Sequence, residues 1–228
     1  MAKHSITRAV RAAFPHTVPI LTGYLVLGAA YGLLMQTTGF GAPWVLLMSA
    51  VAYCGSMQFV AITLLAGAYD PLQALLMSLM VNARHLFYGV SMLGKYRGIG
   101  AVKPLLIYTM SDETFSVVSS VQPPADVPPN DFYLAVSLLD YFYWIAGSLL
   151  GSVAGQFITF DTTGLDFALT GLFAVLFIEQ LKNPQNRASG VIGLVCTTAA
   201  LAVFGPDSLV IPAMLLVLAV LLVGRKKL

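Results

Sequence analysis

Two adjacent carboxylates, Asp112 and Glu113, lie at the centre of an otherwise apolar stretch of this sequence. Placing both in hydrocarbon costs roughly 5–7 kcal/mol on an insertion scale of about 2.5–3.5 kcal/mol per charge. That cost is normally offset when such groups face a cavity, pair with a cation or bind a proton. We therefore predict that one of the two accepts and releases a proton. The alternative is a short loop at the membrane surface.

A cationic group occurs in the preceding apolar stretch, where Arg84 and His85 follow Asn82. A guanidinium can hold a carboxylate through two hydrogen bonds, either from another side chain or from an amino-acid ligand. A histidine can change its charge near neutral pH, so His85 is a candidate for proton coupling. The alternatives are that Arg84 extends to the membrane surface and that His85 has a structural role.

Two further polar sites interrupt apolar sequence. Gly55 and Ser56 break one run, and Gln58 follows them with an amide that can bind a charged group of a ligand without being charged itself. Small residues in membrane helices also mark close helix contacts, which is the alternative for Gly55 and Ser56. Asp140 stands beside aromatic residues. Three roles are open for it: a proton relay, a partner of Arg84, or a member of an ion pair at headgroup level.

Membrane-spanning helices must position these residues. No Asp, Glu, Lys or Arg occurs between Arg11 and Asp70, and 10% of all residues are charged, against about 25% in typical soluble proteins. A bilayer offers no water to backbone amides, so spanning segments are helices of about 20 apolar residues or strands of a closed barrel. The runs here are helix-length and lack the alternation of barrel strands. We predict an all-α polytopic protein with a single membrane domain over residues 1–228.

Eight apolar stretches follow one another along the chain. They are approximately Thr17–Gln36, Ala42–Gly67, Pro71–Leu93, Pro104–Val121, Phe132–Gln156, Leu165–Leu181, Ala188–Gly205 and Leu209–Val223. Polar residues interrupt the second and the fourth. If these two enter and leave on one face, every basic cluster becomes cytoplasmic, including a basic N-terminal segment (1–14) and the tail (224–228). We predict six full spans and two re-entrant or broken segments, with both termini cytoplasmic. Eight full spans are the alternative.

The two interrupted stretches would enter from opposite faces, each followed by a full span. Inverted repeats of secondary transporters have this arrangement, in which unwound helices direct backbone dipoles at a site near the bilayer centre. Gly147, Gly151 and Gly155 recur at four-residue spacing and predict a close-packing face, either within the chain or toward a partner subunit.

Several classes of protein are disfavoured by the composition and the motifs. The net charge of +2 is too small to indicate nucleic-acid binding. Neither cysteine, Cys54 or Cys196, has metal-ligand or disulfide spacing, and both are expected to be small core residues. No zincin helix, nucleophile elbow, phosphate loop or haem motif is present. We expect no enzyme, no metal and no cofactor.

Six motifs carry a family resemblance. They are Pro19 with Gly23, Gly28 and Tyr31-Gly32; Tyr53–Phe59 after Ser49; Val81–His85; Thr109–Phe115; Tyr143-Trp144; and Gly164–Thr170. Over roughly residues 14–181 the chain resembles the AzlC family, the large subunit of branched-chain amino-acid exporters. The motif at Asp112 differs at one position, because the residue before the aspartate, often threonine in the family, is Ser111.

The resemblance implies export of valine, leucine or isoleucine across the bacterial cytoplasmic membrane, driven by the proton motive force. It also implies a small AzlD-type membrane subunit as partner. On this reading the substrate-binding residues are Gly55, Ser56, Gln58, Asn82, Arg84 and Thr109, and the proton-coupling residues are Asp112, Glu113, His85 and Asp140. Two alternatives are a channel or facilitator for another small polar solute and a non-transporting scaffold subunit. The chain also allows a homo-oligomer.

Overall fold

The computed structural model describes residues 2–67, 70–157, 174, 177–178, 181–182, 184–205 and 209–224. All regular structure in these residues is helical. The chain divides into two compact units, residues 1–161 and 162–228, which are taken separately. Nearly all of the predicted span at 165–181, the motif at 164–170 and residues 225–228 of the predicted tail lie outside the described residues.

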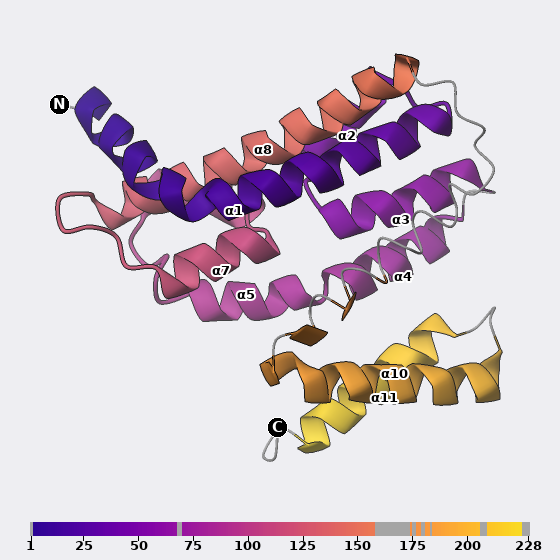
Figure 1. Cartoon of the computed structure of the whole chain (residues 1–228). Coiled ribbons are helices and arrows are strands. Elements are labelled where there is room, and N and C mark those ends of the chain that lie inside the picture. Colours follow the sequence, from indigo (N-terminus) through magenta and orange to yellow (C-terminus); the bar gives the residue numbers. More distant parts are fainter. Residues whose placement is uncertain are drawn as a thin grey trace. The chain divides into compact units, whose positions relative to one another are not determined.

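Helices α1 (Ala2–Thr37) and α8 (Pro129–Phe157) run side by side through the first unit (Figure 1). The predicted span at Phe132–Gln156 is confirmed as part of α8. Helix α1 begins at Ala2, well before the predicted start of the span at Thr17. Pro15 and Pro19 both lie within this helix and do not end it. A proline inside a helix removes one backbone hydrogen bond and bends the helix. Figure 1 shows α1 bent in its N-terminal half, which carries both prolines.

The second and fourth apolar stretches are interrupted, as predicted. They form the helix pairs α2 (Ala42–Val51) with α3 (Gly55–Ala66), and α6 (Lys103–Tyr108) with α7 (Asp112–Ser120). A short 3₁₀ turn, η1 (Gly100–Val102), precedes α6. Helices α3 and α7 both begin near the middle of the first unit and run in opposite directions (Figure 1). The N-terminal ends of two short helices are thereby directed at the same region.

The third stretch is divided at Ala83 into α4 (Pro71–Asn82) and α5 (Arg84–Met92), a break that the sequence did not indicate. At the break, the amide of Ala83 donates to the carbonyl of Met80 at 3.4 Å, so the regular i→i−4 ladder is locally lost. Helix α5 continues in the direction of α4 (Figure 1). The break therefore changes the hydrogen bonding of the stretch without reversing the chain.

Three helices among the described residues are long and apolar enough to cross a membrane: Ile6–Thr37, Pro129–Phe157 and Arg187–Phe204. The last belongs to the second unit, where α10 (Pro184–Phe204) packs on α11 (Val210–Gly224). Large apolar side chains point outward, among them Leu86 at 73% exposure and Val90 at 70%. Such surfaces are unfavourable in water and typical of helices that face lipid.

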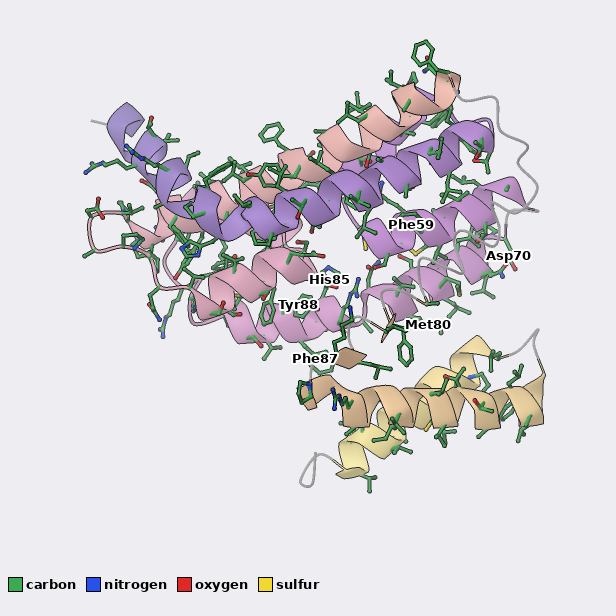
Figure 2. The ribbon with its side chains drawn as sticks, in the orientation of Figure 1. Phe59, Asp70, Met80, His85, Phe87 and Tyr88 are labelled. Atoms are coloured by element: carbon green, nitrogen blue, oxygen red, sulfur yellow. The ribbon has the colours of Figure 1, made fainter. Side chains whose placement is uncertain are left out.

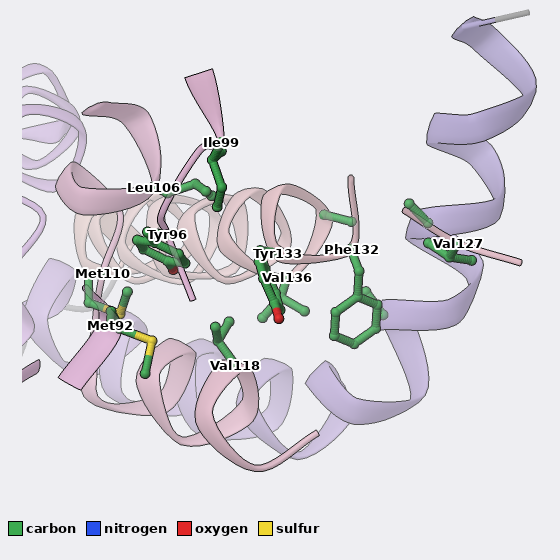
Figure 3. Close-up of a cluster of buried hydrophobic side chains, with 13 residues drawn as sticks. Met92, Tyr96, Ile99, Leu106, Met110, Val118, Val127, Phe132, Tyr133 and Val136 are labelled. Carbon is green, nitrogen blue, oxygen red and sulfur yellow. The ribbon is translucent and has the colours of Figure 1, made fainter. Parts of the chain in front are cut away.

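A cluster of buried apolar side chains closes one end of the first unit (Figure 3). Val118 of α7 and Val136 of α8 lie in it, both fully buried, together with Leu106 of α6 and Met92 of α5. This packing holds the α6–α7 hairpin against α8. The cluster includes Met110 in the turn before Asp112 as well as Val118 near the end of α7, so it fixes α7 along its length.

The predicted glycine face packs within the chain. Gly28 and Gly32 of α1 lie against the backbone of α8 near Ser148, and a Cβ added at Gly32 would collide with Ser148. A Cβ at Gly151 of α8 would likewise collide with the backbone of Ala29. Glycine allows two membrane helices to approach this closely. Because α1 covers this glycine face, the face is not open to a partner subunit.

Replacing Gly32 by alanine is expected to destabilise the α1–α8 contact by about 1–3 kcal/mol, because the added methyl group overpacks it. The measurement is thermal unfolding of the purified protein in detergent. Gly23→Ala is the matched control, because Gly23 lies on the same helix and an added Cβ there meets nothing within 4 Å. Equal melting temperatures for the two variants would contradict the contact.

Candidate functional site

The breaks of three helical segments meet at the side chain of Arg84. Its Nη1 lies 2.8 Å from Oδ2 of Asp112 at the start of α7. Its Nη2 donates to Oγ of Ser56 at 2.8 Å, at the start of α3. Figure 2 shows the neighbouring His85 and Tyr88 on α5 at this junction. Arg84 thus joins two hairpins that are well separated in sequence, and three predicted site residues lie together.

The local sequence explains why carboxylates are placed at this break. Ser111 caps α7, and its Oγ accepts a hydrogen bond from the amide of Thr114 at 3.1 Å. Asp112 and Glu113 occupy the first turn of α7. The positive end of the helix dipole stabilises a negative charge there by roughly 0.3–1 kcal/mol. Tyr88 donates to Oδ1 of Asp112 at 3.0 Å, so both oxygens of this carboxylate have donors.

The ion pair is reachable from outside the protein interior. The side chains of Arg84 and Asp112 are 39% and 37% exposed. Nε of Arg84 is buried without a hydrogen-bond partner in the described part of the chain. The exposed part of the Arg84–Asp112 pair is therefore what a ligand can contact.

A second polar group extends from Glu113 into the protein. Its Oε2 lies 2.6 Å from the hydroxyl of Tyr24 on α1, which lies 2.8 Å from Oγ of Ser111. Ser111 Oγ is 3.0 Å from Oγ1 of Thr114, which donates to Oδ2 of Asp140 on α8 at 2.7 Å. Three hydroxyl groups therefore link two carboxyl groups without a gap.

Asp140 is fully buried, and its Oδ1 has no hydrogen-bond partner among the described residues. The sequence left open whether Asp140 is the partner of Arg84. The structure excludes this, because Arg84 pairs with Asp112 and Asp140 bonds to Thr114. Tyr53, between α2 and α3, has a buried and unpaired hydroxyl and a positive φ of 38°. Few non-glycine residues adopt that conformation, and it marks the turn where the hairpin reverses.

Gln58 belongs to a separate hydrogen-bonded group. Its Oε1 accepts from Nε1 of Trp144 at 2.8 Å, and its Nε2 donates to Oγ of Ser49 at 3.1 Å. A Cβ added at Gly55 would lie 2.9 Å from the Trp144 ring. Both ends of the Gln58 amide thus have protein partners, and Gly55 gives Trp144 room to reach it.

The other predicted site residues are less closely connected to the ion pair. Asn82 accepts a hydrogen bond from the Cys54 thiol at 2.8 Å, which ties α4 to the α2–α3 turn. Thr109 is buried and donates to the carbonyl of Leu105 at 2.8 Å. His85 contacts the ring of Tyr88 edge-on at 5.4 Å, and its Nδ1 is buried without a described partner.

An open apolar pocket of about 390 Å³ lies between α5 and α6 next to Tyr88, and the outward-facing Leu86 and Val90 also line it. Its walls include His85, Tyr88, Gly89, Met92, Ile107 and Met110. Tyr88 connects it to the site, because its ring lines the pocket while its hydroxyl bonds Asp112. No group of three His, Cys, Asp or Glu side chains in the described residues is arranged to hold a metal ion.

Sequence reasoning missed Tyr24, Tyr88, Ser111 and Thr114. The tyrosines gave no signal, because they are two of ten in the chain and no spacing relates them to the carboxylates. Ser111 did give one, since a serine directly before two acidic residues at a helix start is typical of an N-cap. Recognising that cap would have placed Asp112 and Glu113 at the beginning of a helix.

Comparisons with known proteins identify the family of this chain. The model of the family described as AzlC protein matches residues 19–158. The chain is 47% identical to the branched-chain amino acid transport protein AzlC of Bacillus subtilis, over 99% of this chain and 89% of that protein. It is 39% identical to an uncharacterized membrane protein of Helicobacter pylori strain 26695, over 99% of both chains. It is 24% identical to the inner membrane protein YgaZ of Escherichia coli, over 81% and 75%.

No solved structure matches this chain. The family match runs from Pro19 within α1 through α8, which includes the ion pair, the hydroxyl chain and the buried Asp140. The similarity to the Bacillus subtilis protein extends over nearly the whole length, so it includes the second unit as well. This protein is a membrane protein that belongs to the AzlC family.

Proposed function

We propose that this protein is a secondary transporter that exports branched-chain amino acids across the bacterial cytoplasmic membrane. The observation that carries the proposal is the partly exposed Arg84–Asp112 pair at the meeting point of interrupted helices. Secondary transporters bind charged solutes at such breaks, where free backbone groups and helix dipoles replace water. The name of the Bacillus subtilis relative supports the choice of substrate, and the name of the Escherichia coli relative supports the choice of membrane.

The site offers complementary groups to a zwitterion with an aliphatic side chain. Arg84 can bind the α-carboxylate and Asp112 the ammonium group, since both side chains are more than one-third exposed. The apolar pocket beside Tyr88 can take the side chain. Valine, leucine and isoleucine gain about 0.8 kcal/mol for each buried methylene, so an apolar pocket favours them over glycine.

Filling the pocket tests this assignment. Gly89 lines it, and an added Cβ there meets nothing within 4 Å. We expect Gly89→Phe to lower leucine transport about tenfold, which corresponds to roughly 1.4 kcal/mol of lost binding. Gly23→Phe is the control, because Gly23 is equally open but lies on α1 outside the pocket. Unchanged leucine transport in folded Gly89→Phe would contradict this position of the side chain.

Export requires a driving force, and we assign it to proton antiport through Glu113. This carboxyl group lies one residue from the substrate-binding Asp112 and is bonded to Tyr24 rather than to a cation. In this scheme the α2–α3 and α6–α7 hairpins are re-entrant from opposite faces, related as an inverted repeat. Both termini are then cytoplasmic. In the same scheme Asn82 and Thr109 belong to the substrate-binding residues and His85 to the proton-coupling residues.

The proposed assembly includes a small AzlD-type membrane subunit. The family resemblance supports it, and the exposed apolar residues of α5 offer surface for a helix or for lipid. Co-purification of this chain with a co-expressed AzlD-type subunit tests the assembly. Separate elution of the two proteins under mild detergent conditions would contradict it.

The decisive experiment uses the purified protein, with its co-expressed partner, in liposomes. Labelled leucine should accumulate or leave only when a pH gradient is imposed, and a protonophore should abolish the effect. Flux that is insensitive to the gradient would replace the antiporter by the channel or facilitator. A complete lack of flux, with no stabilisation by leucine, would favour the scaffold subunit.

A further inference from the structure

We infer that Glu113 and Asp140 share one proton, which moves between them along the hydroxyl groups of Tyr24, Ser111 and Thr114. This inference rests on the proposed proton antiport and deepens it, because it gives the coupled proton a route and a second binding position. Neither Tyr24, Ser111 nor Thr114 was a candidate from the sequence.

The distances along the chain are all within hydrogen-bonding range. Tyr24 lies 2.6 Å from Glu113 and 2.8 Å from Ser111. Thr114 lies 3.0 Å from Ser111 and 2.7 Å from Asp140. Three helices hold these groups, since Ser111 caps α7 and Tyr24 and Asp140 lie on α1 and α8. Thr114 and Asp140 are fully buried. The Asp140 end of the hydroxyl series is thus sealed from water, so a proton that reaches Asp140 must pass through these side chains.

Counting hydrogens gives two complete arrangements. With the proton on Glu113, Glu113 donates to Tyr24, Tyr24 to Ser111, Ser111 to Thr114, and Thr114 to the Asp140 carboxylate. With the proton on Asp140, every donor and acceptor in this series is reversed. Each hydroxyl has one hydrogen and can donate only once, so the two arrangements cannot coexist.

Transfer between the arrangements is balanced. One O–H bond breaks at Glu113, one forms at Asp140, and each of the three hydroxyls loses one proton and gains another. Ser111 keeps the bond from the Thr114 amide in both arrangements, because that bond uses a separate lone pair. The N-cap of α7 is therefore preserved while the proton moves.

The surrounding charges favour a single shared proton. Around the hydroxyl chain lie Arg84, Asp112 and Tyr88, and Tyr53 from the α2–α3 turn. The charge of Arg84 is already matched by Asp112. Two further carboxylates at Glu113 and Asp140 would leave two negative charges in a low-dielectric interior without a described counter-charge. One proton removes one of them and leaves Tyr24, Ser111 and Thr114 to solvate the other.

Two nearly isosteric substitutions break the chain while leaving both carboxyl groups in place. Tyr24→Phe removes the first hydroxyl group of the relay, and Thr114→Val removes the last. In liposomes, both variants should lose about tenfold or more of pH-gradient-driven leucine transport. Exchange of labelled for unlabelled leucine at equal pH should persist near the wild-type rate, because that exchange needs no net proton movement. Thr114→Ser restores the hydroxyl and should restore coupling.

Matched controls remove a hydroxyl elsewhere. Tyr31→Phe changes a buried tyrosine on α1, and Thr17→Val a buried threonine that donates to the Phe14 carbonyl. Both should keep gradient-driven transport. If wild-type protein shows gradient-driven transport and folded Tyr24→Phe and Thr114→Val match it, the relay is refuted and the antiporter stands. If wild-type protein shows no gradient-driven transport, the proposed function itself fails.

Discussion

Replacing Arg84 by glutamine is expected to weaken leucine binding and leucine transport at least about tenfold. The guanidinium joins Ser56 on one hairpin to Asp112 on the other, each at 2.8 Å. A hydrogen bond to a charged group contributes about 1.5–3 kcal/mol. Losing one such bond to the substrate carboxylate lowers affinity by roughly tenfold to a hundredfold. Leucine-dependent thermal stabilisation and liposome transport measure this directly.

Because Arg84→Gln leaves Asp112 without its cationic partner, thermal unfolding must first show that the variant is folded. Arg97→Gln is the matched control, since Arg97 is exposed and lies after α5 outside the site. It should bind and transport leucine at the wild-type level. Wild-type leucine affinity in Arg84→Gln would show that the substrate binds elsewhere.

Substitutions of the two adjacent acidic residues are expected to impair different transport activities. Glu113→Gln keeps an oxygen that can accept from Tyr24 but cannot carry a proton, so gradient-driven leucine transport should fall about tenfold or more while leucine exchange persists. Asp112→Asn removes the counter-charge of Arg84 and the partner of the substrate ammonium, so both activities should be lost. The two assays, run side by side in liposomes, separate the roles.

Asp126→Asn is the control for removal of a carboxylate, because Asp126 lies exposed in the loop before α8. It should leave both assays unchanged. The assignment of separate roles is wrong if Glu113→Gln and Asp112→Asn lose the same activity. It is also wrong if either variant transports leucine at the wild-type rate with the wild-type pH dependence.

The sequence predicted the interrupted stretches correctly because their physical cause is local. A run of apolar residues broken by Gly55 and Ser56, or by Asp112 and Glu113, cannot remain one lipid-facing helix without burying unpaired polar groups. The predicted span at Phe132–Gln156 is likewise a local property of composition. The same reasoning failed at Ala83, because an apolar alanine carries no signal for a break.

The contacts between segments were beyond a single sequence. Arg84 had several carboxylates as candidate partners, and composition could not choose between Asp112 and Asp140. The choice depends on which helix starts lie near the α4–α5 break, and packing of the hairpins against α8 decides that. Gln58 shows the same limit, since its partner Trp144 is far away in sequence and becomes a neighbour only when α3 meets α8.

The glycines of α8 were read correctly as a packing face, but the sequence left their partner open. Gly28 and Gly32 show why it is α1, because both surfaces must lack side chains for the two backbones to come this close. The prolines of α1 misled the prediction of its start. Pro15 and Pro19 bend this helix without ending it.

The most direct test of the site is chemical labelling of a cysteine in place of Ser56, in a background without Cys54 and Cys196. Ser56 touches Arg84 at the junction, so a small water-soluble thiol reagent should reach it, and saturating leucine should slow the reaction. Ser49→Cys is the control, because Ser49 is fully buried and bonded to Gln58, and it should remain unlabelled. Labelling of Ser56→Cys that leucine does not change, or no labelling at all, would contradict a solute-binding site at this junction.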